Sequence, residues 1–297
     1  MNENKKIAWL YVLLTTAISA VAVIFRHILD VNYIDPVTGF YSRETLTPDA
    51  FTVFLAVAVV LVITSAFMFR RDLLSSELKR GTVFTAITSM ICAVSVVFSA
   101  LIYLMGQKSS MSGEVVQSVE NINMAGSIIA FVAAIYYFAV LFSGKSKAAF
   151  VTFLSFFPVI WTLFRLMPYY IDHSVAMNSP MSILKQFALI LLMLYQLFET
   201  RAMLGRSKPR IYFILANLAV IFVSAAFLPE VVYFLEGRIG MCFDVMCAIY
   251  CGTCALYVLS REIAFASSSD GMILVQKKSG NQSKHKDDLF TPDDDNE

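Results

Sequence analysis

Eight long apolar stretches run through this chain, and only short polar segments separate them. A bilayer core of about 30 Å needs about 20 apolar residues of helix to cross it. Lipid offers no hydrogen-bond partners, so each spanning segment must pair its own backbone groups, which a helix does internally. A membrane β-barrel would instead show segments of about 10 residues with alternating polarity, and the sequence contains none. The pattern predicts an all-α, polytopic integral membrane protein with a bundle of eight transmembrane helices.

The composition agrees with this class of protein. Of the 297 residues, 58% are hydrophobic and 15% are charged, whereas soluble domains carry about 25% charged residues. The predicted helices fall within one transmembrane domain, residues 1–265. The predicted spans are Ile7–Leu29, Ala50–Phe69, Thr82–Met105, Ile122–Phe142, Ala148–Tyr170, Ile183–Phe198, Ile211–Leu228 and Ile239–Ser260.

The basic residues predict how the chain is threaded. Lys and Arg are concentrated in alternate gaps: 17 lie on the side that holds both termini and 6 lie on the other side. Cytoplasmic loops carry the excess of Lys and Arg, so both termini are predicted to be cytoplasmic in a multi-pass protein of the cell membrane. The basic residues predicted on the cytoplasmic side include Lys5, Lys6, Arg70, Arg71, Lys79, Arg80, Lys145, Lys147, Arg201, Arg206, Lys208, Arg210 and Arg261.

The first apolar stretch has a second interpretation. Lys5 and Lys6 precede it, and Ala20-Val21-Ala22 resembles the small-residue cleavage site of a signal peptide. Cleavage there would leave seven spans and an external N-terminus. The apolar run continues through Phe25 and reaches a spanning length, which favours an uncleaved helix.

The C-terminal segment, residues 266–297, differs from the rest of the chain. It is polar and ends in a cluster of acidic residues. A segment of this composition buries too little apolar surface to offset the entropy of folding. We therefore expect a disordered cytoplasmic tail, too short to hold a catalytic domain.

Ionisable residues within apolar spans are costly to keep in lipid, so they are the first candidates for a functional site. The predicted substrate-binding set lies toward the external side and consists of Asp244, Arg165, Glu230, Arg26 and Lys185. One interpretation is a polar outer-leaflet cavity for a solute or lipid headgroup. The other is a set of basic side chains that reach toward the headgroups, with one internal ion pair. For that pair, Arg165 is the preferred partner of Asp244, since a guanidinium can grip a carboxylate with two donors.

One side of the last span carries small residues and thiols. Asp244, Cys247, Cys251 and Cys254 recur at helical spacing, and Ala248, Gly252 and Ala255 extend the same side. A thiol stripe could bind a soft metal, but the four cysteines of this span, Cys242, Cys247, Cys251 and Cys254, are spread over more of the helix axis than one tetrahedral site covers. Small residues let neighbouring helices approach closely, so Ala248, Gly252 and Ala255 are predicted to form a packing surface, with no metal site.

The sequence predicts no enzyme and no cofactor, because zinc-protease, nucleophile-elbow and glycine-rich phosphate motifs are absent. A net charge of +1 gives no reason to expect nucleic-acid binding. The preferred prediction is a non-catalytic membrane module, such as a sensor, assembly factor or complex subunit, whose partners are the bilayer and other membrane proteins. The alternative is a transporter of an unidentified small solute or lipid-like molecule through the polar outer-leaflet cavity. Transport requires a polar path from both sides, so Gln196 and Asn217 should then align with Asp244.

Overall fold

The computed structural model describes residues 3–34, 40–41, 46–68, 82–106, 117–142, 148–171, 179–204 and 209–287. Within these ranges every regular secondary-structure element is a helix, and the only β-type pairing is an isolated bridge between Ile34 and Tyr41. The all-α prediction is therefore confirmed for the described chain. The helices are α1 (Glu3–Asn32), α2 (Thr47–Met68), α4 (Val83–Leu104), α5 (Gln117–Phe142), α6 (Ala148–Leu154), α7 (Phe156–Leu166), α8 (Pro168–Ile171), α9 (Pro180–Met203), α10 (Pro209–Leu235) and α11 (Phe243–Asp287).

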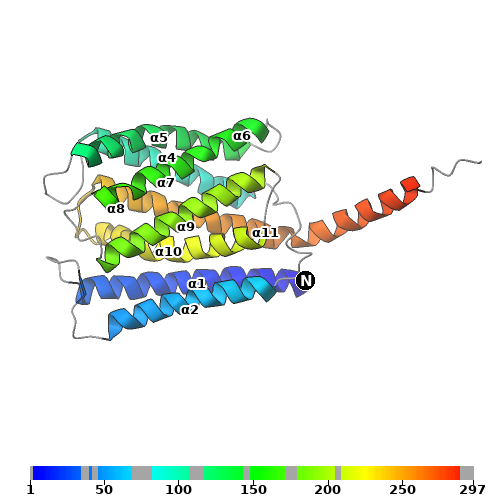
Figure 1. The fold of residues 1–297 in the computed structure, drawn as a ribbon, viewed down its shortest axis with the longest axis horizontal. Coiled ribbons are helices and arrows are strands. Elements are labelled where there is room, and N and C mark those ends of the chain that lie inside the picture. The colour runs from blue at the N-terminus through cyan, green and yellow to red at the C-terminus, as the bar shows by residue number, and fades with distance from the viewer. Residues whose placement is uncertain are drawn as a thin grey trace, which may run out of the picture.

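The long helices run side by side along one axis, with α1 and α2 at one flank and α4, α5 and α6 at the other (Figure 1). Between the flanks, α10 packs on α9, α11 and α1, and α11 also packs on α4. In their most apolar windows 78% and 72% of α10 and α11 residues are buried, against 33% and 28% for α1 and α2. The bundle is therefore organised around α10 and α11, and a site between buried side chains has to involve them.

Eight segments of the described chain are long and apolar enough to cross a membrane, with α6, α7 and α8 together forming one of them. Large apolar side chains such as Leu10, Val57 and Phe98 lie exposed on the outside of the bundle. A soluble protein rarely exposes so much apolar surface. These features are those of a multi-pass membrane protein, as the sequence predicts.

The start of α1 and the outgoing part of α11 lie at the same end of the bundle (Figure 1). We call this end the N-terminal face. The opposite face is where α1 ends at Asn32 and α11 begins at Phe243. An even number of spans returns the chain to its starting side, so the two ends share a face whichever way the bundle is oriented.

The fifth predicted span is not one continuous helix. It is interrupted at Ser155, between α6 and α7, and again at Met167, between α7 and α8. Pro158 and Pro168 lie just after these interruptions. Proline lacks a backbone N–H and its ring crowds the preceding turn, so each proline breaks the hydrogen-bond ladder upstream of itself. The first interruption leaves Ser155 buried beside α9.

The predicted ends of the last two spans need correction. The structure continues α10 through Pro229 to Leu235, so residues 231–235 extend the spanning helix beyond the predicted end at Leu228. It begins α11 at Phe243, four residues later than Ile239, because residues 236–242 form a turn in which Gly237 has a φ of +72°. Asp244 therefore lies in the first turn of α11, closer to the opposite face than the sequence indicates.

In the structure α11 continues beyond the bundle to Asp287, into the segment for which the sequence predicts a disordered tail from residue 266 (Figure 1). A continuing helix satisfies its own backbone groups without needing tertiary contacts. Residues 288–297 lie outside the described residues. So do most of the basic loop positions used to predict the topology, including 70–80, 145–147 and 206–208.

The small residues of the last span lie at helix contacts. Ala248 is fully buried, and Ala255 and Gly252 are also buried. A Cβ atom added to Gly252 would lie 2.7 Å from the Leu228 side chain of α10. Glycine at this position therefore lets α10 and α11 approach more closely than a larger residue allows.

Candidate functional site

The five residues predicted as a substrate-binding set take part in three ion pairs near the opposite face of the bundle. Lys185 of α9 donates a hydrogen bond to Glu230 of α10 and joins these two helices. The Arg165 guanidinium of α7 lies 3.4 Å from the Asp244 carboxylate of α11. The third cation, Arg26, is paired within its own helix.

Arg26 of α1 is 2% exposed and lies 3.0 Å from Asp30 on the next turn. It also donates a hydrogen bond to the Tyr41 hydroxyl oxygen in the segment that follows α1. Burial raises the pKa of the Tyr41 phenol, against the opposing effect of the Arg26 charge, so this hydroxyl remains neutral. The arrangement ties the connection after α1 to the helix end.

Arg165 is held in place from three sides. Besides Asp244, it donates a 3.2 Å hydrogen bond to the Asn123 side-chain oxygen of α5, and its guanidinium lies 4.6 Å from the centre of the Phe243 ring. The Arg165 side chain is 10% exposed, whereas that of Asp244 is 41% exposed. The pair preferred from the sequence is thus present, but its carboxylate faces an opening and its guanidinium faces the core.

From the sequence, the external charges were interpreted either as a polar cavity or as basic side chains that reach toward the headgroups. Arg26 and Arg165 are buried and paired, so they do not simply extend toward headgroups. Lys185 and Glu230 are also largely buried together. The five predicted residues form separate ion pairs, but the pairs lie close enough to interact electrostatically. Lys185 interacts with Asp244 as well as with Glu230, and Asp30, the partner of Arg26, interacts with Lys185 and Glu230. The predicted residues therefore lie in one electrostatically connected region near the opposite face.

A second polar cluster lies toward the N-terminal face. Glu199 of α9 is buried, accepts a 2.8 Å hydrogen bond from the Tyr257 hydroxyl and lies 3.2 Å from Arg261 Nε. Both partners belong to α11 and lie one helical turn apart. The geometry at Arg261 Nε is that of an ion pair without a directed hydrogen bond. A buried carboxylate is thus held by a cation and a phenol, all away from lipid.

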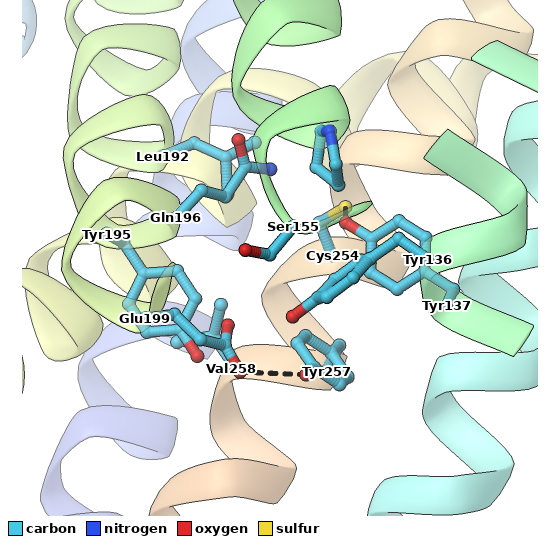
Figure 2. A pocket seen from close by; sticks show the side chains of 11 residues that line it. Tyr136, Tyr137, Ser155, Leu192, Tyr195, Gln196, Glu199, Cys254, Tyr257 and Val258 are labelled. Carbon is cyan, nitrogen blue, oxygen red and sulfur yellow. Dashed lines mark hydrogen bonds between the residues drawn. The ribbon is translucent and has the colours of Figure 1, made fainter. Parts of the chain in front are cut away.

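A narrow cavity opens beside this cluster, between α5, α7, α9 and α11. Figure 2 shows the Glu199–Tyr257 hydrogen bond, with Gln196, Ser155 and Cys254 beside it. The free space admits about one water molecule. The lining residues are Tyr136, Tyr137, Ser155, Pro158, Leu192, Tyr195, Gln196, Glu199, Cys254, Tyr257 and Val258.

Gln196 supplies the cavity with an unused donor. Its side-chain oxygen accepts a 2.9 Å hydrogen bond from the Thr162 hydroxyl of α7, but its buried Nε2 has no hydrogen-bond partner. A buried donor without a partner costs about 1–3 kcal/mol, so a water or ligand oxygen that accepts from Nε2 would be stabilised. The cavity therefore combines a free donor, Gln196, with a fixed acceptor, Glu199.

Phenol groups continue the polar lining on both sides of the cavity. The Tyr137 hydroxyl lies 3.0 Å from the Tyr250 hydroxyl and 3.4 Å from Cys254 Sγ. The Tyr195 and Tyr212 hydroxyls form another 3.0 Å contact between α9 and α10. Tyrosines can donate and accept hydrogen bonds while their rings fill apolar space, so they suit a polar site inside lipid.

The two clusters lie on one line along α11. The positions Asp244, Cys247, Cys251, Cys254 and Arg261 recur at steps of three, four or seven residues, which places them on one side of the helix. At 1.5 Å per residue, Asp244 and Arg261 are about 25 Å apart along the helix. This distance is most of the thickness of a bilayer core. The cavity with Cys254 and Gln196 lies between the two ends.

Other predicted residues lie elsewhere. Asn217 of α10 accepts a hydrogen bond from Thr15 of α1 and donates 2.7 Å to the Phe213 carbonyl, so it belongs to the α1–α10 contact and not to this line. The five cysteines are buried free thiols. Among the described residues, no group of three or more His, Cys, Asp or Glu side chains is arranged to hold a metal ion.

Several of these residues were not predicted from the sequence. Arg261 was predicted only as a basic residue of the cytoplasmic side and Tyr257 was not singled out, but both contact Glu199 inside the bundle. The available signal was the spacing: the thiol-bearing side of the last span reaches Arg261 seven residues after Cys254. The sequence could not show that α9 places Glu199 opposite that position.

Comparison with protein-family models, curated proteins and solved structures gives no match for this chain. The function therefore has to be argued from the geometry of the site.

Proposed function

We propose that this protein is a transporter that moves a small polar solute across the membrane, along the line between α5, α7, α9 and α11. The observation that supports this most is the buried cavity on the N-terminal side of the bundle, where the free Gln196 donor lies near the Glu199 carboxylate. Buried ionisable groups in membrane proteins commonly mark solute pathways. The proposal assigns no catalysis and no cofactor to the chain.

The two ion pairs at the ends of the line would serve as gates. Glu199–Arg261 joins α9 to α11 on the N-terminal side of the cavity, and Arg165–Asp244 joins α7 to α11 on the opposite side. With both pairs closed, the cavity is occluded, as it is here. Opening one pair at a time would expose the cavity to one side. The interruption at Ser155 gives α6 and α7 a place to bend during this change.

The alternative is a non-catalytic membrane module, as preferred from the sequence. In that case the polar line would be a static set of interhelical contacts, and the cavity would never open. Gln196 lies beside Cys254, on the side of α11 that carries Asp244, which favours transport. Asn217 lies at the α1–α10 contact and not on this line, which counts against transport. The two functions differ in whether the interior reaches water.

We further propose that the N-terminal face is cytoplasmic in the cell membrane, because the Lys and Arg excess lies in the loops on that side. Reporter fusions after Lys108 and after Lys208 should report an external and a cytoplasmic position, respectively. The reverse pair of signals would exclude this orientation. An external tag at the N-terminus, together with a cytoplasmic C-terminus, would support cleavage of the first span.

Access to the cavity can be tested through the native Cys254, which lines it. We expect a variant that keeps only Cys254 to react with a membrane-impermeant methanethiosulfonate reagent added to either side of sealed vesicles. A gated path exposes this thiol to water in turn from each side, although it is 1% exposed in the closed conformation. Mass spectrometry of the intact protein measures the extent of labelling.

The matched control places a thiol at an equally buried position away from the cavity. Ala219→Cys, in an otherwise cysteine-free protein, puts it on α10 at a site that is 0% exposed and does not line the cavity. We expect this variant to remain unlabelled. Labelling of Cys254 no faster than the control, from both sides, would favour the static module and reject transport along this line.

A further inference from the structure

Glu262 of α11 is a buried carboxyl group outside the polar line described above. The residue is 2% exposed, and neither carboxylate oxygen has a hydrogen-bond partner among the residues that the structure describes. It is one of the largest fully buried side chains of the protein. An ionised carboxylate without partners in such a place is among the most unfavourable groups a protein can bury.

The groups around Glu262 come from α1, α10 and α11, and they are mainly aromatic. Tyr11 of α1, Phe213 of α10 and Phe265 of α11 form a small apolar cluster, with ring centres 4.7 Å and 6.0 Å apart for successive pairs. Tyr11 is close enough to interact electrostatically with Glu262. Its hydroxyl is committed elsewhere, since it donates 2.8 Å to the Val62 carbonyl and accepts from Ser65.

The nearby cations do not neutralise this carboxyl group. Arg261, the preceding residue, pairs with Glu199 on another side of α11. Arg210 of α10 lies over the Phe67 ring, 5.2 Å from its centre. From α4, the polar groups that reach α11 here are the hydroxyls of Thr85 and Thr88, and both contact Ser260. No described side chain supplies Glu262 with a positive charge or a donor.

We propose that Glu262 is a proton-binding site. In this conformation the carboxyl group carries a proton and is neutral, which removes the cost of a buried charge. A metal cation is a poor alternative occupant, because hard cations need several oxygen ligands and the Glu262 oxygens have no polar neighbours within hydrogen-bond distance. A proton needs no further ligand.

Proton release would be linked to the packing of α1. Val12 of α1 packs on Ala266 of α11, one turn beyond Glu262, and Trp9 and Ile263 border this contact. The ionised form requires water, so the carboxyl group would ionise only when α1 moves away from α11. This inference stands apart from the proposed transport path, since it involves α1 and none of the cavity residues.

The test uses dicyclohexylcarbodiimide, a membrane-soluble reagent that adds to protonated carboxyl groups. We expect the full-length protein in lipid vesicles at neutral pH to gain the adduct on Glu262, identified by peptide mass spectrometry. Modification should exceed that of Glu199 about tenfold, because Glu199 is equally buried but is paired with the Arg261 cation. Glu262→Gln should lose the adduct and keep the fold, since glutamine has the shape of the neutral acid.

A water-soluble carbodiimide distinguishes a buried acid from an exposed one. It should leave Glu262 unmodified in the same vesicles. Equal modification of Glu199 and Glu262, absence of the adduct from Glu262, or modification by the water-soluble reagent would each overturn the proposal. Failure of Cys254 to become labelled would reject the transport path and leave this inference intact.

A second measurement follows from proton linkage. The unfolded chain releases the Glu262 proton above the ordinary glutamate pKa of about 4.3, whereas the folded protein keeps it. Unfolding at neutral pH therefore releases a proton, and the stability of the wild-type protein should decrease as pH rises. The Glu262→Gln variant should show a smaller decrease. Identical pH profiles for the two proteins would contradict a proton held at this position.

Discussion

Replacing Glu199 with alanine should lower the free energy of unfolding by about 3–5 kcal/mol, because Arg261 would remain buried without its partner. The two side chains are 4% and 8% exposed, so water cannot replace the lost carboxylate without opening the bundle. The Tyr257 hydroxyl would also lose its acceptor. Unfolding of the purified protein in mixed detergent micelles, followed by circular dichroism, measures the change.

The double variant Glu199→Met/Arg261→Met should be much less damaged than Glu199→Ala alone. Both charges are then removed and the volume is largely kept, and replacing a complete buried pair by apolar residues is often neutral. A cost that simply equals the sum of the two single substitutions would show that Glu199 and Arg261 are not coupled.

Asp244→Ala provides a matched comparison at the other end of the line. The Asp244 side chain is 41% exposed, and Arg165 keeps its contact with Asn123. The loss should therefore be smaller, about 1 kcal/mol. If Asp244→Ala proved as damaging as Glu199→Ala, the Arg165–Asp244 pair would have to be more isolated from water than the structure shows.

Replacing Gly252 with leucine should destabilise the bundle by about 2–3 kcal/mol through overpacking between α10 and α11. Even the first added atom, Cβ, would lie 2.7 Å from Leu228 Cδ2, and the rest of the leucine side chain has to occupy the same contact. Leu228→Ala should partly restore stability in the double variant, because it removes the atoms that the new side chain meets. The same detergent unfolding assay applies.

Two substitutions on α11 separate this effect from a general sensitivity of the helix. Cys251→Ala removes one buried thiol from the same side of α11 and should be tolerated, since Cys behaves there as a small apolar residue. Leu256→Phe adds bulk at a position that is 50% exposed and should change little. A harmless Gly252→Leu combined with a damaging Cys251→Ala would reject close packing and point to a role for the thiol.

The sequence alone determined the architecture of this protein. Hydrophobic length and composition are local properties, so eight runs of spanning length predict eight helices without any knowledge of how those helices meet. Proline disrupts the preceding turn by a local chemical rule, as at Pro158, but the exact break at Ser155 could not be foreseen from the sequence. The ionisable residues within the spans could also be identified, because the free-energy cost of placing such a group in lipid depends on its position within a span. Asp244 and Arg165 were found in this way.

Which ionisable residues pair with one another was decided by the tertiary structure. The exception is the Arg165–Asp244 pair, which was predicted from the sequence. The Glu199–Arg261 contact joins α9 to α11, and the Lys185–Glu230 contact joins α9 to α10. Hydrophobic periodicity does not indicate which helices are neighbours or which of their sides face each other. The role proposed for Glu262 also depends on tertiary structure, because it rests on the lack of hydrogen-bond partners for this carboxyl group among the described residues. A residue's type and spacing state what it can bind, but whether water, a cation or nothing lies beside it depends on helix packing. That packing is set by side-chain shape over the whole bundle, as at Gly252 and Leu228, and no single segment contains it.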